Sequence, residues 1–124
     1  SNIQDGVIIH SKAGGLVKIG EYTSIAHRSI VHGPCVVGDH VFIGFNTVLF
    51  NCVVGNCSVV RHNSVVENCE IPEGFYIPST SNIHQFADLA SIQQVSAQEK
   101  DFSESVARAN QELVKGYKKL QNEF

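Results

Sequence analysis

The sequence predicts an all-β coil plus a helix, in which a parallel β-helix built from six-residue repeats has a C-terminal α-helix packed along it. Three observations lead to this fold class. An aliphatic residue returns at about every sixth position through residues 3–77, a glycine follows several of these aliphatic residues, and the last part of the chain carries one apolar helical stripe. We expect residues 1–78 to form the coil that carries the functional site. Residues 79–124 should form a connecting segment and the helix of the same domain.

The period of six separates this coil from ordinary secondary structure. A helix repeats about every 3.6 residues and an exposed strand about every 2 residues, so neither explains the spacing. Short strands joined by tight corners do, with three strands in each turn, and successive turns then pair at about 4.8 Å. One step is ten residues long because four extra residues fall within 11–15. The positions expected to point inward are Ile3, Ile9, Ile19, Ile25, Val31, Val37, Ile43, Leu49, Val54, Val60, Val66, Ile71 and Ile77.

Glycines and prolines mark the corners and the end of the coil. Gly38 and Gly55 are two of the glycines that follow inward residues, where a missing Cβ lets the backbone turn without a clash. We expect the coil to end near Pro78, because Pro72 and Pro78 cannot donate to a strand ladder. The spacing does not fix the hand of the coil. By its repeat the chain resembles the hexapeptide proteins, which implies a left-handed parallel β-helix.

The segment after the coil divides into two parts. Residues 79–100 are polar and predict an irregular connection with one short helical turn around 85–89. A helix then begins, because Asp101 is a suitable N-cap and Glu104 completes a capping box. About 20 helical residues span roughly 30 Å, enough to run back along the coil. The stripe that would face the coil is formed by Phe102, Val106, Ala109, Leu113, Tyr117 and Leu120.

Charge and composition exclude several classes of protein. The 9 basic and 12 acidic residues leave a formal charge of −3 without a basic patch for nucleic acid. No apolar run is long enough to span a membrane. Cys35, Cys52 and Cys69 recur at intervals of 17, which predicts a ladder of structural thiols in a reducing, cytoplasmic compartment. The chain begins at Ser1 and contains no Met, so we expect it to be processed, cut or incompletely represented at its start.

Three histidines stand out by their place in the repeat. His10 and His32 each follow an inward residue by one, and removing the four extra residues from the 22 between them leaves one turn of 18. The two imidazoles should therefore lie on one face about 4.8 Å apart, where both can reach a zinc ion at about 2.0–2.1 Å. His27 belongs to another face, so a homotrimer would be needed to bring it to the pair. We interpret His40, His62 and His84 as polar surface residues.

At these histidines the sequence resembles a known family. The segments NIQDGVIIH (2–10), SIAHRSIVHGPCVVGDHVFIGF (24–45) and EIPEGFYIPS (70–79) resemble the γ-class carbonic anhydrases, including their carboxysomal and archaeal members. The resemblance covers residues 2–78 and resumes weakly in NQELVKGY (110–117). It implies a trimeric lyase that interconverts CO₂ and bicarbonate at a zinc ion. His10, His27 and His32 would be the metal ligands at the trimer interface, and three imidazoles also accept Fe²⁺ or Co²⁺.

The resemblance also implies roles for several polar residues. Gln4 corresponds to the family residue that hydrogen-bonds the water on the metal. Asn2 and Asn110 correspond to asparagines that border the substrate pocket. Asp5 corresponds to an interface acid that pairs with an arginine.

The chain departs from the archaeal members of the family at the proton pathway. Their shuttle glutamates lie in earlier turns and in a long acidic loop after the first histidine, whereas residues 11–15 are short and hold no acid. Arg108 stands where the archaeal enzyme has a tyrosine. We therefore expect a metal site with weak turnover.

Two other functions remain open from the sequence. The first is a catalytically weak or inactive scaffold that organises trimers with carboxysome shell or Rubisco-associated proteins, which would place the chain in a carboxysome. The second is hexapeptide acyl transfer. That activity uses one catalytic histidine and a long acyl-donor groove, so three metal-type histidines disfavour it.

Overall fold

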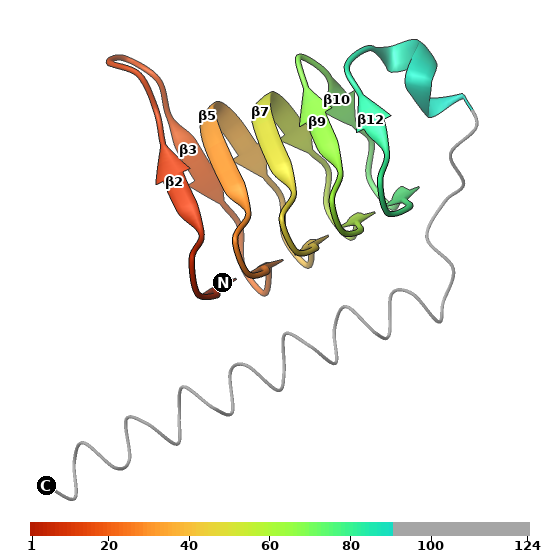
Figure 1. Cartoon of the computed structure of the whole chain (residues 1–124). Coiled ribbons are helices and arrows are strands. Elements are labelled where there is room, and N and C mark those ends of the chain that lie inside the picture. The colour runs from red at the N-terminus through yellow and green to blue at the C-terminus, as the bar shows by residue number, and fades with distance from the viewer. Residues whose placement is uncertain (91–124) are drawn as a thin grey trace, which may run out of the picture.

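The computed structural model describes residues 1–90, and these form a parallel β-helix with three strand-bearing faces (Figure 1). The first face consists of β1 (Asn2–Ile3), β4 (Ser24–Ile25), β6 (Phe42–Ile43), β8 (Val59–Val60) and β11 (Tyr76–Ile77). The second consists of β2 (Ile8–His10), the first halves of β5 (Ile30–Val37) and β7 (Val48–Val54), β9 (Val65–Glu67) and β12 (Asn82–Ile83). The third consists of β3 (Val17–Ile19), the second halves of β5 and β7, and β10 (Glu70–Ile71). The predicted C-terminal helix, including Arg108 and Asn110, lies outside the described residues.

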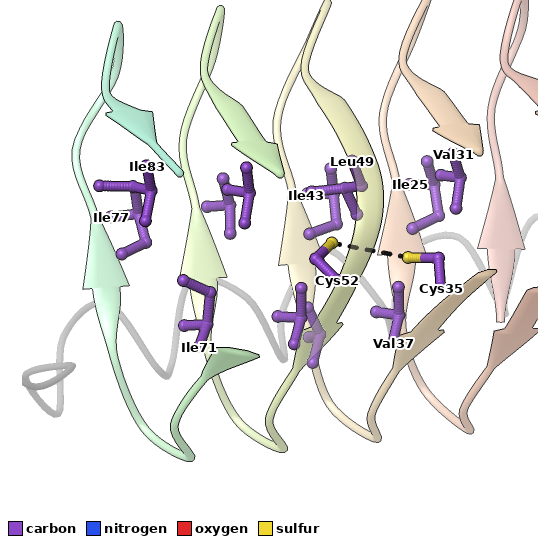
Figure 2. Close-up of a cluster of buried hydrophobic side chains, with 14 of the residues drawn as sticks. Ile25, Val31, Cys35, Val37, Ile43, Leu49, Cys52, Ile71, Ile77 and Ile83 are labelled. Atoms are coloured by element: carbon purple, nitrogen blue, oxygen red, sulfur yellow. Dashed lines mark hydrogen bonds between the residues drawn. The ribbon is translucent and has the colours of Figure 1, made fainter. Parts of the chain in front are cut away.

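The core is made of the aliphatic ladders that the six-residue period predicts. On each face the inward residue of one turn is in register with the inward residue of the next, as Leu49 is with Val31 and Val66. Figure 2 shows these side chains stacked along the inside of the coil. Every predicted inward residue from Ile25 onward is buried. Burial of these branched side chains away from water is the main force that holds successive turns together.

The first turn differs from this pattern because nothing described here covers its open side. Ile3 and Ile9 are in register with Ile25 and Val31, as predicted, yet they remain 41% and 45% exposed. Ile19, on the third face, is only partly buried. The inward register is therefore confirmed for these residues, whereas their burial is not.

The coil continues beyond Pro78, so its predicted end was wrong. Strand β12 pairs with β9, and Ile83 is buried as the next inward residue. The prolines are tolerated because they occupy corners: the carbonyl of Pro72 accepts a hydrogen bond from Ser58 Oγ at 3.0 Å, and that of Pro78 accepts one from Ser64 Oγ at 3.2 Å. At a corner no strand partner requires an N–H donor, so a proline there costs no ladder hydrogen bond.

The predicted helical turn after the coil is confirmed as the 3-10 helix η1 (Phe86–Leu89). Asp88 accepts hydrogen bonds at Oδ2 from the backbone N–H groups of His84 and Gln85. Leu89 is buried against the core cluster. The turn thus covers the last described part of the coil. None of the helices among residues 1–90 has the length and apolarity needed to cross a lipid bilayer.

The backbone geometry of the corners accounts for several asparagines and glycines of the coil. Among residues 1–90, nine residues other than glycine adopt a left-handed backbone there, including Asn46 and Asn63, whose side-chain amides are hydrogen-bonded at 2.8 Å. Gly38 and Gly55 do not have positive φ. A Cβ added at Gly55 would instead lie 2.6 Å from the Glu73 backbone nitrogen of the next turn. The predicted Cβ clash is therefore confirmed, and it would be with the next turn of the coil.

The predicted cysteine ladder is present in the coil. Cys35 and Cys52 are buried on successive turns with their Sγ atoms 3.7 Å apart (Figure 2), and Cys69 is partly buried on the following turn. The hydrogen bond to Cys35 and burial both raise the pKa of Cys52, and burial raises the pKa of Cys69. The hydrogen bond with Cys52 lowers the pKa of Cys35. Neutral thiols such as those of Cys52 and Cys69 are poor nucleophiles, so these two cysteines pack as small apolar side chains.

Candidate metal centre

The central feature of the site is a pair of histidines on adjacent turns of the second face. His10 at the end of β2 is in register with His32 in β5. Nδ1 of His10 lies 3.3 Å from Nε2 of His32, and the ring centroids are 5.2 Å apart. The predicted stacking of these two histidines is confirmed. Two converging imidazole nitrogens are a donor set that suits Zn²⁺.

A backbone carbonyl fixes the tautomer of His32. Nδ1 of His32 lies 2.7 Å from the carbonyl oxygen of Gly33. The carbonyl can only accept, so Nδ1 carries the proton, and in the neutral imidazole Nε2 then presents its lone pair toward His10. Metal-binding histidines use such a hydrogen bond to set the orientation and basicity of the ring. The arrangement therefore fits a metal ligand without further rearrangement of His32.

His27 is placed apart from this pair, at the corner that leads from the first face to the second. Its side chain is exposed, and its ring stacks on that of Phe45 with the centroids 5.7 Å apart. Within residues 1–90, no three His, Cys, Asp or Glu side chains come close enough to hold a metal ion together. The separation of His27 from His10 and His32 agrees with the predicted division between two faces.

Two candidate polar residues lie together on the first strand. Asn2 and Gln4 point outward from β1 and the residue that follows it, and both Asn2 Nδ2 and Gln4 Oε1 are buried without a hydrogen-bond partner. Asp5 is exposed at the adjacent corner, where its carbonyl accepts the N–H of Arg28 at 3.1 Å. The structure thus groups Asn2, Gln4 and Asp5 near one corner. Asn110 lies outside the described residues.

Comparison with known proteins relates this geometry to a family. A family model described as bacterial transferase hexapeptide (six repeats) matches residues 16–51. The carboxysome assembly protein CcmM of Nostoc sp. is 35% identical over 94% of this chain and 23% of its own length. A carbonic anhydrase of Methanosarcina thermophila is 33% identical over 95% of this chain and 56% of its own length. The chain belongs to the hexapeptide-repeat γ-class carbonic anhydrase family. It spans less than a quarter of the CcmM protein and about half of the Methanosarcina enzyme.

A solved structure supports the fold of this γ-class family member. A hexapeptide transferase family protein from Anaplasma phagocytophilum superposes with a TM-score of 0.63 at 18% identity, covering 94% of this chain and 92% of the other. At that identity the likeness concerns the fold alone. The name of the matching family model likewise describes the repeat and does not distinguish acyl transfer from CO₂ chemistry.

Two aromatic side chains border the histidines of this γ-class chain, and the sequence reasoning did not include them. Phe50 meets His32 edge-on with the ring centroids 5.1 Å apart, and Phe45 stacks on His27. Each phenylalanine follows its histidine by one turn of 18 residues. The same arithmetic that paired His10 with His32 would therefore have found both. The Gly33 carbonyl carried no such signal, because its direction depends on the local corner.

The histidines interpreted as polar surface residues have definite structural contacts. Nδ1 of His62 accepts the backbone N–H of Phe45 at 2.8 Å, and its ring stacks on Phe45 with the centroids 4.4 Å apart. Burial, and then the charge of Arg61, lower the pKa of His62. His40 stacks on Tyr22, and His84 lies 3.8 Å from both Glu67 and Asp88. His62 in particular is a corner residue that has to be neutral to accept its hydrogen bond.

Proposed function

We propose that this chain forms a homotrimer that catalyses the reversible hydration of CO₂ to bicarbonate as a γ-class carbonic anhydrase. The carrying observation is the convergence of His10 Nδ1 and His32 Nε2 at 3.3 Å, with His27 displayed on a different face. In a cyclic trimer, one face of each subunit meets a different face of its neighbour. His10 and His32 of one copy would then share a Zn²⁺ with His27 of the next. Fe²⁺ or Co²⁺ could replace zinc in an all-histidine site.

The residues of this chain divide the remaining work by their chemistry. A bound zinc ion lowers the pKa of a coordinated water toward about 7. His32 needs no tautomer change to act as a ligand, because the Gly33 carbonyl already holds the proton on Nδ1. The amides of Gln4 and Asn2 are neutral and can orient oxygen atoms by hydrogen bonds without adding charge. We assign Asn110 to the same pocket on the strength of the family resemblance.

Proton release is the step for which this chain has the fewest suitable side chains. The corner after His10, residues 11–15, contains no acid. A positioned carboxylate normally speeds transfer of a proton between a site and solvent. We infer that buffer molecules take over this role and that turnover is weak at low buffer concentration.

A second function is favoured by one specific comparison. The Nostoc relative is named as a carboxysome assembly protein, and 94% of this chain aligns with it. In that role the trimer would be a scaffold of low or no activity that binds carboxysome shell or Rubisco-associated proteins, located in the carboxysome rather than free in the cytoplasm. Binding of partner proteins at the coil surface would then matter more than catalysis at the metal.

The experiment that tests the proposed function combines two measurements on one sample. Purified trimer is analysed for metal by mass spectrometry and assayed for CO₂ hydration by stopped flow. The matched control is the His10→Ala, His32→Ala double variant. We expect about one metal ion per chain and hydration above the control. Full metal occupancy with hydration no faster than the control would reject the enzyme and favour the scaffold.

The same proposal includes two features of the fold. We propose that the coil is left-handed, as in hexapeptide proteins, and that a helix over residues 101–120 packs along it with the apolar stripe that begins at Phe102. A crystal structure of the trimer decides both. A right-handed coil, or a chain without helix after Asp101, would refute the corresponding part.

A further inference from the structure

One buried hydroxyl in the coil differs from all its neighbours. Six polar side chains are buried among the described residues, and five of them donate to a backbone carbonyl, as Ser58 Oγ does to Pro72 at 3.0 Å. The other four donors are Thr23, Ser29, Thr47 and Ser64. Ser24 is the sixth. It is 1% exposed, and its Oγ has no hydrogen-bond partner.

Ser24 lies on the turn next to Asn2 and Gln4, whose side chains also carry unpartnered polar atoms. It is in register with Asn2 on the neighbouring turn, and Asn2 Nδ2 and Gln4 Oε1 are likewise buried without partners. Further along the same outward column the registered residues are Phe42, Val59 and Tyr76. Asn2 and Ser24 therefore lie at the end of a column whose other members are aromatic or aliphatic, next to the corner that carries Asp5 and His27.

This grouping has no structural benefit that the described residues supply. An unpartnered buried polar group costs free energy, typically about 1–3 kcal/mol. Alanine at position 24 would remove that cost, and Val59 shows that the column accepts an apolar residue. A serine that opposes folding in this way is better explained by a ligand that completes its hydrogen bonds.

The three atoms define the chemistry of that ligand. Asn2 Nδ2 donates, Gln4 Oε1 accepts, and Ser24 Oγ can do either. One water oxygen can accept from Asn2 and Ser24 while donating to Gln4, and buried waters typically make about three such bonds. CO₂ has no proton to donate, so it cannot satisfy Gln4.

We propose that Asn2, Gln4 and Ser24 form a subsite that holds one ordered water molecule, with Ser24 as a positioning residue for the two amides. Its role in turnover rests on the proposed carbonic anhydrase function. There, the hydroxyl keeps Asn2 and Gln4 in the orientation that the reaction uses and retains water beside the pocket. The water-binding part of the proposal is independent of activity.

The experiment compares four variants of the metal-loaded trimer. Ser24→Ala removes the hydroxyl, Ser24→Thr retains it, and Ser24→Val has the shape of threonine without it. Ser58→Ala is the matched control, because it removes a buried serine hydroxyl that has a partner. The measurements are a high-resolution crystal structure, urea unfolding, metal content, and kcat and KM for bicarbonate dehydration.

We expect a water molecule bonded to all three side chains in the parent protein and in Ser24→Thr. Ser24→Ala and Ser24→Val should lose it, keep their metal, and be at least as stable as the parent, whereas Ser58→Ala should be less stable. The kcat/KM of Ser24→Ala should fall roughly tenfold, as for other residues that support a metal site indirectly, and Ser24→Thr should restore it.

Three results would overturn the proposal. A parent crystal structure in which a side chain, including one from a neighbouring subunit, satisfies Ser24 would exclude the water subsite. Loss of stability in Ser24→Ala equal to that in Ser58→Ala would show a structural role. Loss of the water without change in kcat/KM would remove the positioning role. An inactive parent protein would reject the carbonic anhydrase function, while the crystal structures and unfolding data would still decide the subsite.

Discussion

His10 Nδ1 and His32 Nε2 lie 3.3 Å apart although 22 residues separate them in the chain. They are in register because the chain between them makes one regular turn of 18 residues, with four further residues inserted at a corner. The extra residues leave the ladder as a corner loop, so the register of the two strands is preserved. This pair is the part of the candidate metal centre that one chain can supply.

Replacement of His10 should separate metal binding from folding. His10 is exposed, and its backbone is held by pairing of β2 with β5. We expect His10→Ala to remove most of the bound metal, because it removes one of three imidazole ligands. The circular dichroism spectrum should not change. Metal content and circular dichroism are measured on the same sample, and unchanged metal stoichiometry would show that His10 is not a ligand.

CO₂ hydration should depend on the concentration of external buffer. Residues 11–15 offer no carboxylate beside His10, so a buffer base has to carry the proton away. We expect kcat measured by stopped flow to rise with buffer concentration at constant pH and ionic strength. A chemically similar ion that does not titrate near that pH is the control. High activity that is independent of buffer would mean that another residue of the chain performs the transfer.

The position of a side chain along one aliphatic ladder should decide its contribution to stability. Leu49 and Ile9 belong to the same ladder, but Leu49 is fully buried and Ile9 is 45% exposed. We expect Leu49→Ala to lower the free energy of unfolding by about 2–5 kcal/mol. The loss for Ile9→Ala should be clearly smaller. Urea unfolding of both variants checks this, and equal losses would mean that the open side of the first turn is covered in solution.

The corner histidine His62 should make stability depend on pH. Its folded pKa lies below the ordinary value because of burial and Arg61, so the unfolded chain takes up the proton first as pH falls. The stabilising contribution is therefore complete above pH about 6.5 and declines below it.

The corresponding experiment compares His62→Ala with the parent protein at two pH values. At pH 7.5 the variant should be less stable by about 1 kcal/mol, because the Phe45 N–H loses its acceptor. At pH 5 this deficit should shrink. His40→Ala is the matched control, since it removes a stacked ring but no backbone acceptor. A His62→Ala deficit of the same size at both pH values would contradict the neutral-acceptor role.

Much of the coil could be predicted from the sequence, because each strand places one aliphatic residue inward and these residues recur at about every sixth position. Counting alone placed Ile25 with Ile43 and His10 with His32. The extent of the coil could not be predicted from its prolines. From the sequence, Pro78 is expected to end the coil. In the structure it lies at a corner, where its carbonyl accepts a hydrogen bond from Ser64 Oγ and no N–H donor is needed.

The parts of the candidate site that could not be predicted depend on local geometry. The Gly33 carbonyl that fixes His32 depends on how the backbone crosses one corner. Ser24 and Ser58 are the same residue type and both are buried, yet only Ser58 has a partner. Such differences arise from side-chain direction, which the period of the repeat does not encode.

The most direct test of the account is metal binding by mixed trimers. His27→Ala and His32→Ala should each lose metal when alone, because each removes a ligand from every site. Where the intact His10 and His32 of a His27→Ala chain meet the intact His27 of a His32→Ala chain, one complete site forms. Co-refolding equal amounts of the two variants should therefore restore metal to about a quarter of the sites if subunits mix at random in a cyclic trimer. Native mass spectrometry verifies the mixing. Mixed trimers that bind no metal would contradict a centre shared between subunits.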